Sequence, residues 1–416
     1  MNKKLGLMSL TALVLSSMVG AGVFSLPQNM AEVASPAALI IGWIITGVGI
    51  LFLALSLLLL SRLRPDLDGG IFTYAKEGFG EFIGFCSAWG YWVCAVVANV
   101  SYLVIVFAAV SFFTDSPNNI IFGDGNTWQA LLGESILLWV VHFLVLRGVQ
   151  TAASINLMAT MAKLIPLGLF IIVALLAFNM DIFTFDFEGI KMGVPIWEQV
   201  KNTMLITLWV SELAMMKNPS MAPLLVQLIG NIGEIVIAAG LILSVCGAYL
   251  SWTIMAAEVP YIAALHHSFP KQLSKQNHND APSSSLWFTN LAVQLSLVLI
   301  WLTGSNYNTL LTIASEMILV PYFLVGAFLF KVAIERSSRG LLLIAIPASL
   351  YGLWLLYASG VINLLLSVVL YAPGVLIFLY SRKQYKDKQS LNTSEKILLM
   401  MVLIGAIPAC GYLVFN

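Results

Sequence analysis

Long apolar stretches separated by short polar connections run through almost the whole chain. They lack the alternation of apolar and polar residues over about ten positions that membrane barrel strands show. A helix needs about 20 mostly apolar residues to cross a bilayer core of about 30 Å. The pattern predicts an all-α integral membrane protein with about eleven full crossings and one half-inserted helix at 196–210. The expected crossings are 6–27, 37–60, 80–113, 128–146, 152–178, 231–263, 285–303, 307–330, 340–358, 360–381 and 395–415.

The positions of the basic residues predict the orientation. Cytoplasmic connections of membrane proteins are enriched in lysine and arginine. If the N-terminus is cytoplasmic, 16 of the 20 basic residues fall on that side. The same alternation makes 80–113 and 231–263 single long helices rather than hairpins.

The alternation also constrains the middle of the chain. The span at 152–178 ends outside, and the span at 231–263 must start outside to keep Lys271 and Lys275 inside. The chain between them must therefore leave and return on one side. This predicts a half-inserted or surface helix at 196–210, which is tolerated at membrane depth only when protein or cavity water covers its free backbone.

Composition excludes several functions. The chain of 416 residues is 60% hydrophobic and 10% charged, whereas soluble domains are about 25% charged. This argues against a soluble enzyme and a nucleic-acid-binding protein. Neither a phosphate loop nor an HExxH or nucleophile-elbow motif occurs, so we expect no enzyme and no cofactor. All four cysteines lie in apolar runs, which predicts neither disulfides nor a metal site: Cys86, Cys94, Cys246 and Cys410.

Ionisable residues within the apolar runs are candidate functional groups because they are costly there. Lys163 either serves a site or reaches back to the cytoplasmic face. Glu316 either serves a site or is a buried protonated carboxyl. Glu258 lies near the inner end of its span, which favours an interfacial role. For Glu134 and His142 we expect a packing or surface role.

The first span carries two glycines two residues apart, Gly20 and Gly22, beside Ser16 and Ser17. One interpretation is a broken helix whose free amides bind a carboxylate. The other is close helix packing through small residues. Four aromatic residues are also candidates to line a cavity: Tyr91, Trp92, Trp209 and Trp252.

Several motifs together resemble one family. Residues 18–29 (MVGAGVFSLPQN) resemble the first-helix signature of amino acid–polyamine–organocation (APC) transporters, and residues 67–74 (LDGGIFTY) resemble their glycine-pair loop. A narrower resemblance, to the basic amino acid/polyamine antiporters, rests on residues 87–92, 202–210 and 250–253. Within that family, nearly the whole chain resembles the bacterial arginine/ornithine antiporters.

The resemblance implies a LeuT-like inverted-repeat (5+5) transporter bundle in one domain, 1–416. Its parts would be a first repeat at 1–180, an incomplete second repeat at 195–335 and additional helices at 340–416. It implies antiport of external arginine for internal ornithine across the bacterial inner membrane. The partners are then these two small molecules and the lipid bilayer, without nucleic acid, and a homodimer stays open.

The resemblance also implies roles for particular residues. Tyr91, Trp209 and Trp252 match gating aromatics, and Lys163 matches a lysine that stands where sodium-dependent relatives bind an ion. Glu316 is an additional candidate for contact with a cationic substrate. The implied substrate-binding residues are Ser17, Met18, Gly20, Ala21, Gly22, Cys94, Ala95, Asn99, Trp209 and Ser315.

One departure from the family pattern is large. After Val210 the chain continues with a sequence that resembles the loop before helix 8 of the family. About fifty residues therefore appear to be missing, including half of helix 6 and all of helix 7. We expect this form to transport poorly or not at all.

Three readings follow. The first is an arginine/ornithine exchanger impaired by the gap, with another basic amino acid or polyamine exchanger as its neighbour. The second is a membrane protein that no longer transports. The third is an intramembrane enzyme, for which no catalytic set is visible.

Overall fold

The fold is built from helices in every part of the chain that the structure describes. The computed structural model describes residues 7–18, 30, 33–67, 69–116, 118–208, 231–303, 316–385 and 391–415. Within these ranges β-structure is limited to one isolated bridge between Ser116 and Asn119. The helices are α1 (Leu7–Met18), α3 (Pro36–Leu63), α4 (Ile71–Phe79), α5 (Glu81–Thr114), α6 (Trp128–Leu146), α7 (Val149–Leu176), α8 (Met180–Thr184), η1 (Ile190–Met192), α9 (Ile196–Leu208), α11 (Asn231–Leu265), η2 (Lys271–Ser274), α12 (Ser283–Thr303), α14 (Leu319–Glu335), α15 (Arg339–Ser359), α16 (Val361–Gln384) and α17 (Thr393–Phe415).

Several of these helices are long enough to cross a membrane. Among the described residues, 7 helices are long and apolar enough to cross a bilayer. They are Pro36–Leu63, Glu81–Thr114, Trp128–Leu146, Asn156–Leu176, Ile235–Leu265, Ser283–Leu302 and Arg339–Ser359. The prediction that 80–113 and 231–263 are single helices is confirmed by α5 and α11. The expected total of eleven crossings stays a prediction.

Helix α3 shows how such a helix divides between protein and lipid. Its buried side is a stripe at spacings of four and three residues, made largely of small side chains: Gly42, Thr46, Gly49, Leu53, Ser56 and Leu60. Large apolar residues point outward, including Ile44 at 60% and Leu51 at 56% exposed. In a soluble protein such a face would be polar. Small residues inward and large apolar residues outward indicate a lipid-facing helix.

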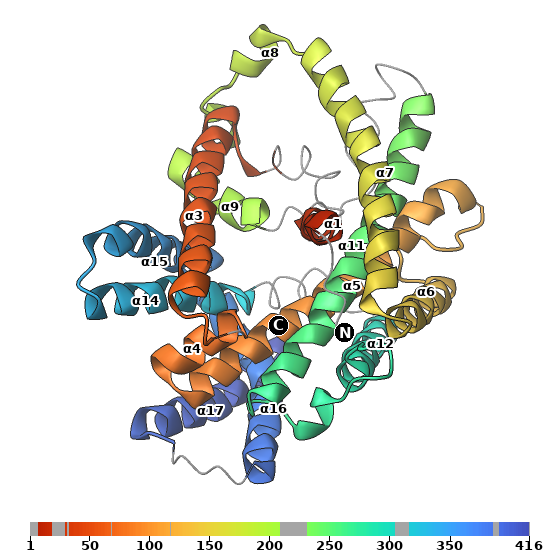
Figure 1. The fold of residues 1–416 in the computed structure, drawn as a ribbon. Coiled ribbons are helices and arrows are strands. Elements are labelled where there is room, and N and C mark those ends of the chain that lie inside the picture. Colours follow the sequence, from red (N-terminus) through yellow and green to blue (C-terminus); the bar gives the residue numbers. More distant parts are fainter. Residues whose placement is uncertain are drawn as a thin grey trace.

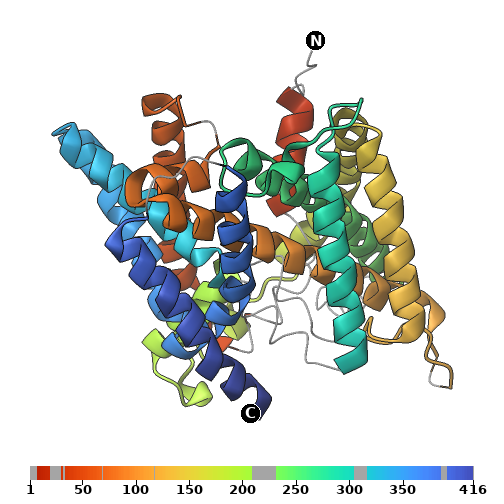
Figure 2. The same cartoon turned by 90° about the horizontal axis from the view of Figure 1, so that it is seen from below.

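The core centres on α5, which packs along α11. Most of α5 is buried, including Ala95, Asn99 and Leu103 at 0% exposed. Helices α6 and α12 lie side by side against this pair at one edge, while α16 and α17 lie together on another side (Figures 1 and 2). Buried positions on every side of α5 make it the helix around which the others pack.

The described part of the expected span at 307–330 contains a break in the helix. Met317 and Ile318 form a turn, and α14 begins only at Leu319. Pro321 is the third residue of α14, where a missing backbone N–H costs no helical hydrogen bond. Glu316 therefore precedes a turn rather than lying in the middle of a continuous helix. The apolar run hid this turn because hydropathy does not distinguish a buried turn from a helix.

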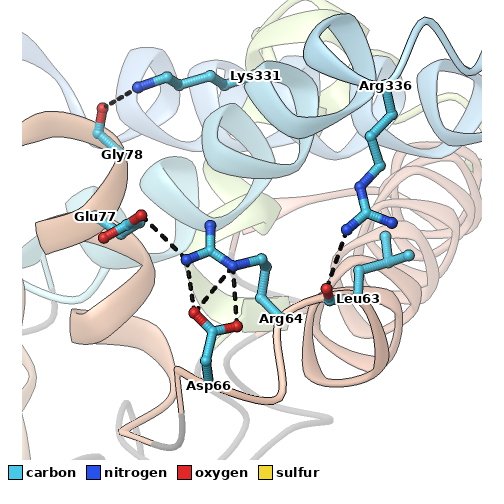
Figure 3. A network of polar contacts seen from close by, with 7 residues as sticks. All are labelled: Leu63, Arg64, Asp66, Glu77, Gly78, Lys331 and Arg336. Carbon is cyan, nitrogen blue, oxygen red and sulfur yellow. Dashed lines mark hydrogen bonds and ion pairs between the residues drawn. The ribbon is translucent and has the colours of Figure 1, made fainter.

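Basic connections gather at one end of the bundle. Lys331 Nζ donates to Gly78 O at 3.0 Å, and Arg336 Nη2 donates to Leu63 O at 3.2 Å (Figure 3). Both contacts tie the end of α14 to the connection between α3 and α5. The loop after α11 joins the same end, since Lys76 Nζ donates to His266 O at 3.1 Å. These connections are among those predicted to be cytoplasmic.

The same end carries a charged cluster, also drawn in Figure 3. Arg64 contacts Asp66 at 2.7 Å and Glu77 at 3.0 Å. The hydrogen bond from Arg64 lowers the pKa of the exposed Asp66 carboxyl, and the hydrogen bond to Asp66 in turn raises the pKa of Arg64. The cluster joins the end of α3 to α4.

Helix α9 covers most of the segment predicted to be half-inserted. It packs against α3 and α15, and Gln199 accepts a hydrogen bond from Ser35 N at 2.9 Å. On its other side Trp197 is 63% exposed. Residues 209–230, where the gap is expected, lie outside the described ranges. The half-inserted arrangement stays a prediction.

Candidate functional site

Lys163 joins α7 to the end of the described part of α1. The Lys163 side chain is 0% exposed, and its Nζ donates to Ser16 O at 3.1 Å and contacts Ser16 Oγ at 3.0 Å. Figure 1 shows α1 end-on, with α7 and α11 beside it. The alternative that Lys163 reaches back to the cytoplasmic face does not fit this burial.

Two further polar residues of α7 extend this contact. Asn156 Nδ2 and Thr160 Oγ1 both donate to Ala12 O at 3.3 Å. Residues 156, 160 and 163 are spaced by four and three, so they form one polar face of an otherwise apolar helix. Sequence reasoning missed Asn156 and Thr160, although this spacing was the signal that could have revealed them.

Helix α11 completes the junction of α1 and α7. Ser251 Oγ donates to Asn156 Oδ1 at 3.1 Å, and Trp252 Nε1 donates to Ser17 O at 3.1 Å. Gly247 allows the close approach, because a Cβ there would lie 3.2 Å from Ser16 Oγ. We call this set the paired junction: Ser16, Ser17, Asn156, Thr160, Lys163, Ser251 and Trp252.

Among the expected site residues of α5, Asn99 differs from the junction residues in its pairing within the described part of the chain. Cys94 and Ala95 are buried, at 2% and 0% exposed. Asn99 is also 0% exposed, yet neither polar atom of its amide has a hydrogen-bond partner in the described part of the chain. Buried polar groups without partners are rare and costly. Asn99 therefore has the unmet bonding capacity that a ligand can use.

Glu316 reaches the same helix through its neighbouring residues. It is 1% exposed, and a Cβ on Gly90 of α5 would lie 2.6 Å from Met317 O. Tyr371 donates its hydroxyl to Met317 O at 3.3 Å. The turn after Glu316 thus packs against α5 at Gly90, which precedes Tyr91 in the sequence.

A cavity of about 230 Å³ lies between the start of α4, α5 and α11. Tyr91 lines it from α5, and Met255 and Glu258 line it from α11. Trp252 precedes these α11 residues by one to two helical turns. The cavity therefore adjoins α5 and α11 where the expected gating residues lie.

Several predicted site residues cannot be located. Gly20, Ala21, Gly22, Trp209 and Ser315 lie outside the described ranges. Met18 ends α1, but its side chain is also outside the description. The residues brought together are therefore those of α1, α5, α7 and α11.

Glu134 and His142 lie away from this region, where α6 packs against α12. They are 2% and 0% exposed. His142 Nδ1 lies 2.9 Å from Asn290 Nδ2. Their burial fits packing rather than surface positions, the two roles expected from the sequence. Across the described ranges, no group of three or more His, Cys, Asp or Glu residues could hold a metal ion.

Comparisons with known proteins cover the whole chain. An arginine/ornithine antiporter of Pseudomonas aeruginosa is 40% identical, with 98% of this chain and 97% of that protein aligned. A protein of Escherichia coli K12, provisionally named an arginine/ornithine antiporter, is 62% identical over 462 positions that cover all of both chains. An arginine/agmatine antiporter of Chlamydia pneumoniae is 35% identical over 100% of this chain and 97% of that protein.

These alignments also bear on the gap. The alignment with the E. coli protein has 462 positions, whereas this chain has 416 residues. At least 46 of these positions are therefore gaps in this chain. The profile of the amino acid permease family matches in two segments, residues 5–213 and 210–407, which meet where the gap was expected.

The long apolar helices and the two matched segments agree on one assignment. The helices indicate a multi-pass membrane protein. The matched profile is that of a family of permeases, which are transporters. The matched segments together span nearly the whole sequence. The chain belongs to the amino acid permease family.

Proposed function

We propose that this protein is an antiporter that exchanges external arginine for internal ornithine. The observation that carries the proposal is the full-length similarity to the Pseudomonas aeruginosa arginine/ornithine antiporter, at 40% identity. At pH 7 both amino acids carry one net positive charge, so one-for-one exchange moves no net charge. Such exchange needs neither ATP nor a catalytic residue.

The proposal includes a fold finer than the helices alone establish. It is the LeuT-like arrangement of two inverted repeats, at 1–180 and 195–335, with the second repeat incomplete. The N-terminus is cytoplasmic and the membrane is the bacterial inner membrane. The gathering of Lys76, Lys331 and Arg336 at one end supports this orientation. A homodimer stays a prediction.

The proposed binding site divides the substrate between two kinds of group. The backbone after α1, at Gly20–Gly22, takes the substrate carboxylate. On α5, the Asn99 amide hydrogen-bonds the substrate, with Cys94 and Ala95 forming the wall beside it. The absence of a partner for Asn99 within the described residues supports this role.

The paired junction has a positioning role in this proposal. The hydrogen bonds of Lys163 and Trp252 to the last described turn of α1 support it. They hold the chain just before the proposed carboxylate site against α7 and α11. A buried ammonium fixed there also supplies positive charge without a bound metal ion, which matches the expected role of Lys163.

The gap favours a second candidate function, that of a membrane protein that no longer transports. At least 46 positions present in the E. coli relative have no counterpart here. The expected loss comprises half of helix 6 and all of helix 7, and therefore one wall of the binding site. We propose that exchange persists at a reduced rate, and the second candidate is an outcome of the test.

The test is counterflow in liposomes. Purified protein is reconstituted with unlabelled ornithine inside, and uptake of labelled arginine is measured beside a chain with the missing segment restored. The proposal predicts arginine uptake that requires internal ornithine or arginine, slower than in the restored chain. Uptake by the restored chain alone would support the non-transporting candidate. Uptake that ignores the internal amino acid would contradict antiport.

A further inference from the structure

Glu258 of α11 is a partly exposed carboxylate that lines a cavity. The cavity of about 230 Å³ is lined by Phe72 from α4, by Ser87 and Tyr91 from α5, and by Met255, Glu258 and Ile262 from α11. Among the described residues that line the cavity, Glu258 alone carries a carboxylate. The volume is below the roughly 300–1,000 Å³ of sites for drug-sized ligands, and so suits one end of a long side chain.

The cavity lies along the face of α11 that also carries Trp252. Met255, Val259 and Ile262 follow Trp252 at spacings of three, four and three residues, which keeps them on one face of the helix. Met255, Glu258 and Ile262 are partly exposed to the cavity, whereas Ala256 and Ala257 are fully buried. Glu258 lies six residues beyond Trp252, or about 9 Å along the helix axis.

The carboxylate of Glu258 has no ion pair in the described part of the chain. Lys76, the basic residue of α4, pairs with Glu81 at 3.1 Å and donates to His266 O at 3.1 Å. A half-buried carboxylate in a largely apolar wall is unfavourable unless a cation compensates its charge.

Two further groups suit a nitrogen cation. Ser87 is 0% exposed, and its hydroxyl has no hydrogen-bond partner among the described residues although it borders the cavity. A hydroxyl oxygen can accept a bond from a guanidinium or ammonium N–H. Tyr91 adds an aromatic ring, the kind of surface against which such cations are stabilised.

We propose that this cavity is a second binding site, which holds the guanidinium or ammonium end of a basic amino acid with Glu258 as its counter-ion. It lies between Trp252 and the end of α11, where the basic connections gather. The substrate cation stops here on its path between the site on α5 and the cytoplasm. The identity of the ligand rests on the proposed function, whereas the preference for a cation rests on the cavity itself.

The test measures the charge preference of the cavity directly. Met255→Cys is introduced, and the purified full chain in lipid nanodiscs reacts with cationic, neutral and anionic methanethiosulfonate reagents of similar size. The rate for the parent chain, with its native cysteines, is subtracted. A cleft of one charge sign raises the local concentration of counter-ions by about tenfold or more. We expect at least a tenfold faster reaction with the cationic reagent than with the neutral one, each relative to free cysteine.

Variants and competitors identify the group responsible. Glu258→Gln keeps the shape and should abolish the charge preference, while Glu335→Gln, at an exposed carboxylate of α14, should leave it unchanged. Arginine, ornithine and guanidinium chloride should each slow the reaction, whereas sodium chloride at equal ionic strength should not. Ile262→Cys repeats the measurement if Met255→Cys fails to fold.

The outcomes separate this inference from the proposed function. Equal rates for all three reagents, or a preference that survives Glu258→Gln, would overturn the inference even if counterflow succeeds. A preference lost in Glu258→Gln with protection by guanidinium would support the cation site even if no exchange is measured. Protection by sodium as effective as that by guanidinium would overturn the assignment to an organic cation.

Discussion

Two regions beside α11 contain buried polar groups, and they differ in how those groups are paired. In the paired junction, Lys163, Asn156 and Trp252 each have hydrogen bonds to α1. On α5, the side-chain polar atoms of Asn99 and Ser87 have no hydrogen-bond partner among the described residues. Both regions lie in apolar helices, so local hydropathy does not explain the difference.

The comparison indicates two uses for costly polar groups in a membrane protein. A paired group fixes one helix against another, and removing it leaves its partner unsatisfied. An unpaired group lowers stability until a ligand binds it. The paired junction is therefore expected to govern stability, whereas Asn99 and Ser87 on α5 are expected to govern substrate affinity.

The largest effect is expected at Lys163. Lys163→Met removes the donor to Ser16 O while keeping a long apolar side chain. Leaving a buried acceptor unpaired costs about 1–3 kcal/mol of unfolding free energy, and we expect exchange to fall at least about tenfold as α1 loosens. Thermal unfolding and counterflow measure the two effects. Lys275→Met, at an exposed lysine, is the control, and equal stability of the two variants would contradict the positioning role.

At Asn99 we expect the opposite result, a loss of arginine affinity without a loss of stability. Asn99→Leu replaces a buried amide that has no hydrogen-bond partner among the described residues with an apolar side chain of similar size, so the unfolding free energy should stay constant or rise. Arginine affinity should fall by about tenfold, the equivalent of one hydrogen bond of about 1.4 kcal/mol. Binding of labelled arginine measures this, with Asn118→Leu in an exposed loop as control. Unchanged affinity would remove Asn99 from the site.

A smaller effect is expected at Trp252. Trp252→Phe keeps an aromatic ring and removes only the N–H that donates to Ser17 O. One such hydrogen bond is worth about 0.5–1.5 kcal/mol. Thermal unfolding should detect that loss, and the exposed Trp197→Phe should show none. A loss of arginine affinity without any loss of stability would mean that Trp252 acts on the substrate, as expected for Asn99, and not on the stability of the paired junction.

The smallest effect is expected outside the membrane, at Asp66. Because Arg64 lowers the pKa of the Asp66 carboxyl in the folded state, this contact stabilises the fold above the unfolded pKa of about 3.9. The contribution decreases as pH falls through the lower folded pKa. Asp66→Asn should lower the melting temperature slightly at pH 7 and progressively less below about pH 4. Asp124→Asn, at an exposed loop carboxylate, is the control variant.

The helices could be predicted largely from the sequence because their signal is local. Apolar runs predicted α6 at its observed bounds and most others to within a few residues. The basic residues predicted which connections share one side, and the contacts among three of those connections agree. Both signals depend on composition over about twenty residues, which the chain itself records.

The features that were missed depend on contacts between distant segments. The turn at Met317–Ile318 lies within a continuous apolar run. Glu395 accepts a hydrogen bond from Phe82 N at 3.0 Å, a contact across 313 positions that no local pattern reveals. Lys163 has its partner on α1, whereas Asn99 has none in the described part of the chain, and this difference appears only once α1, α7 and α5 are assembled.

The most direct test of the distinction between paired and unpaired groups is an experimental structure of the full chain with bound arginine. The account predicts arginine in contact with Asn99 or in the cavity beside Glu258, with the bond from Lys163 to Ser16 intact. Arginine bound at the paired junction, with Lys163 displaced from Ser16, would contradict it.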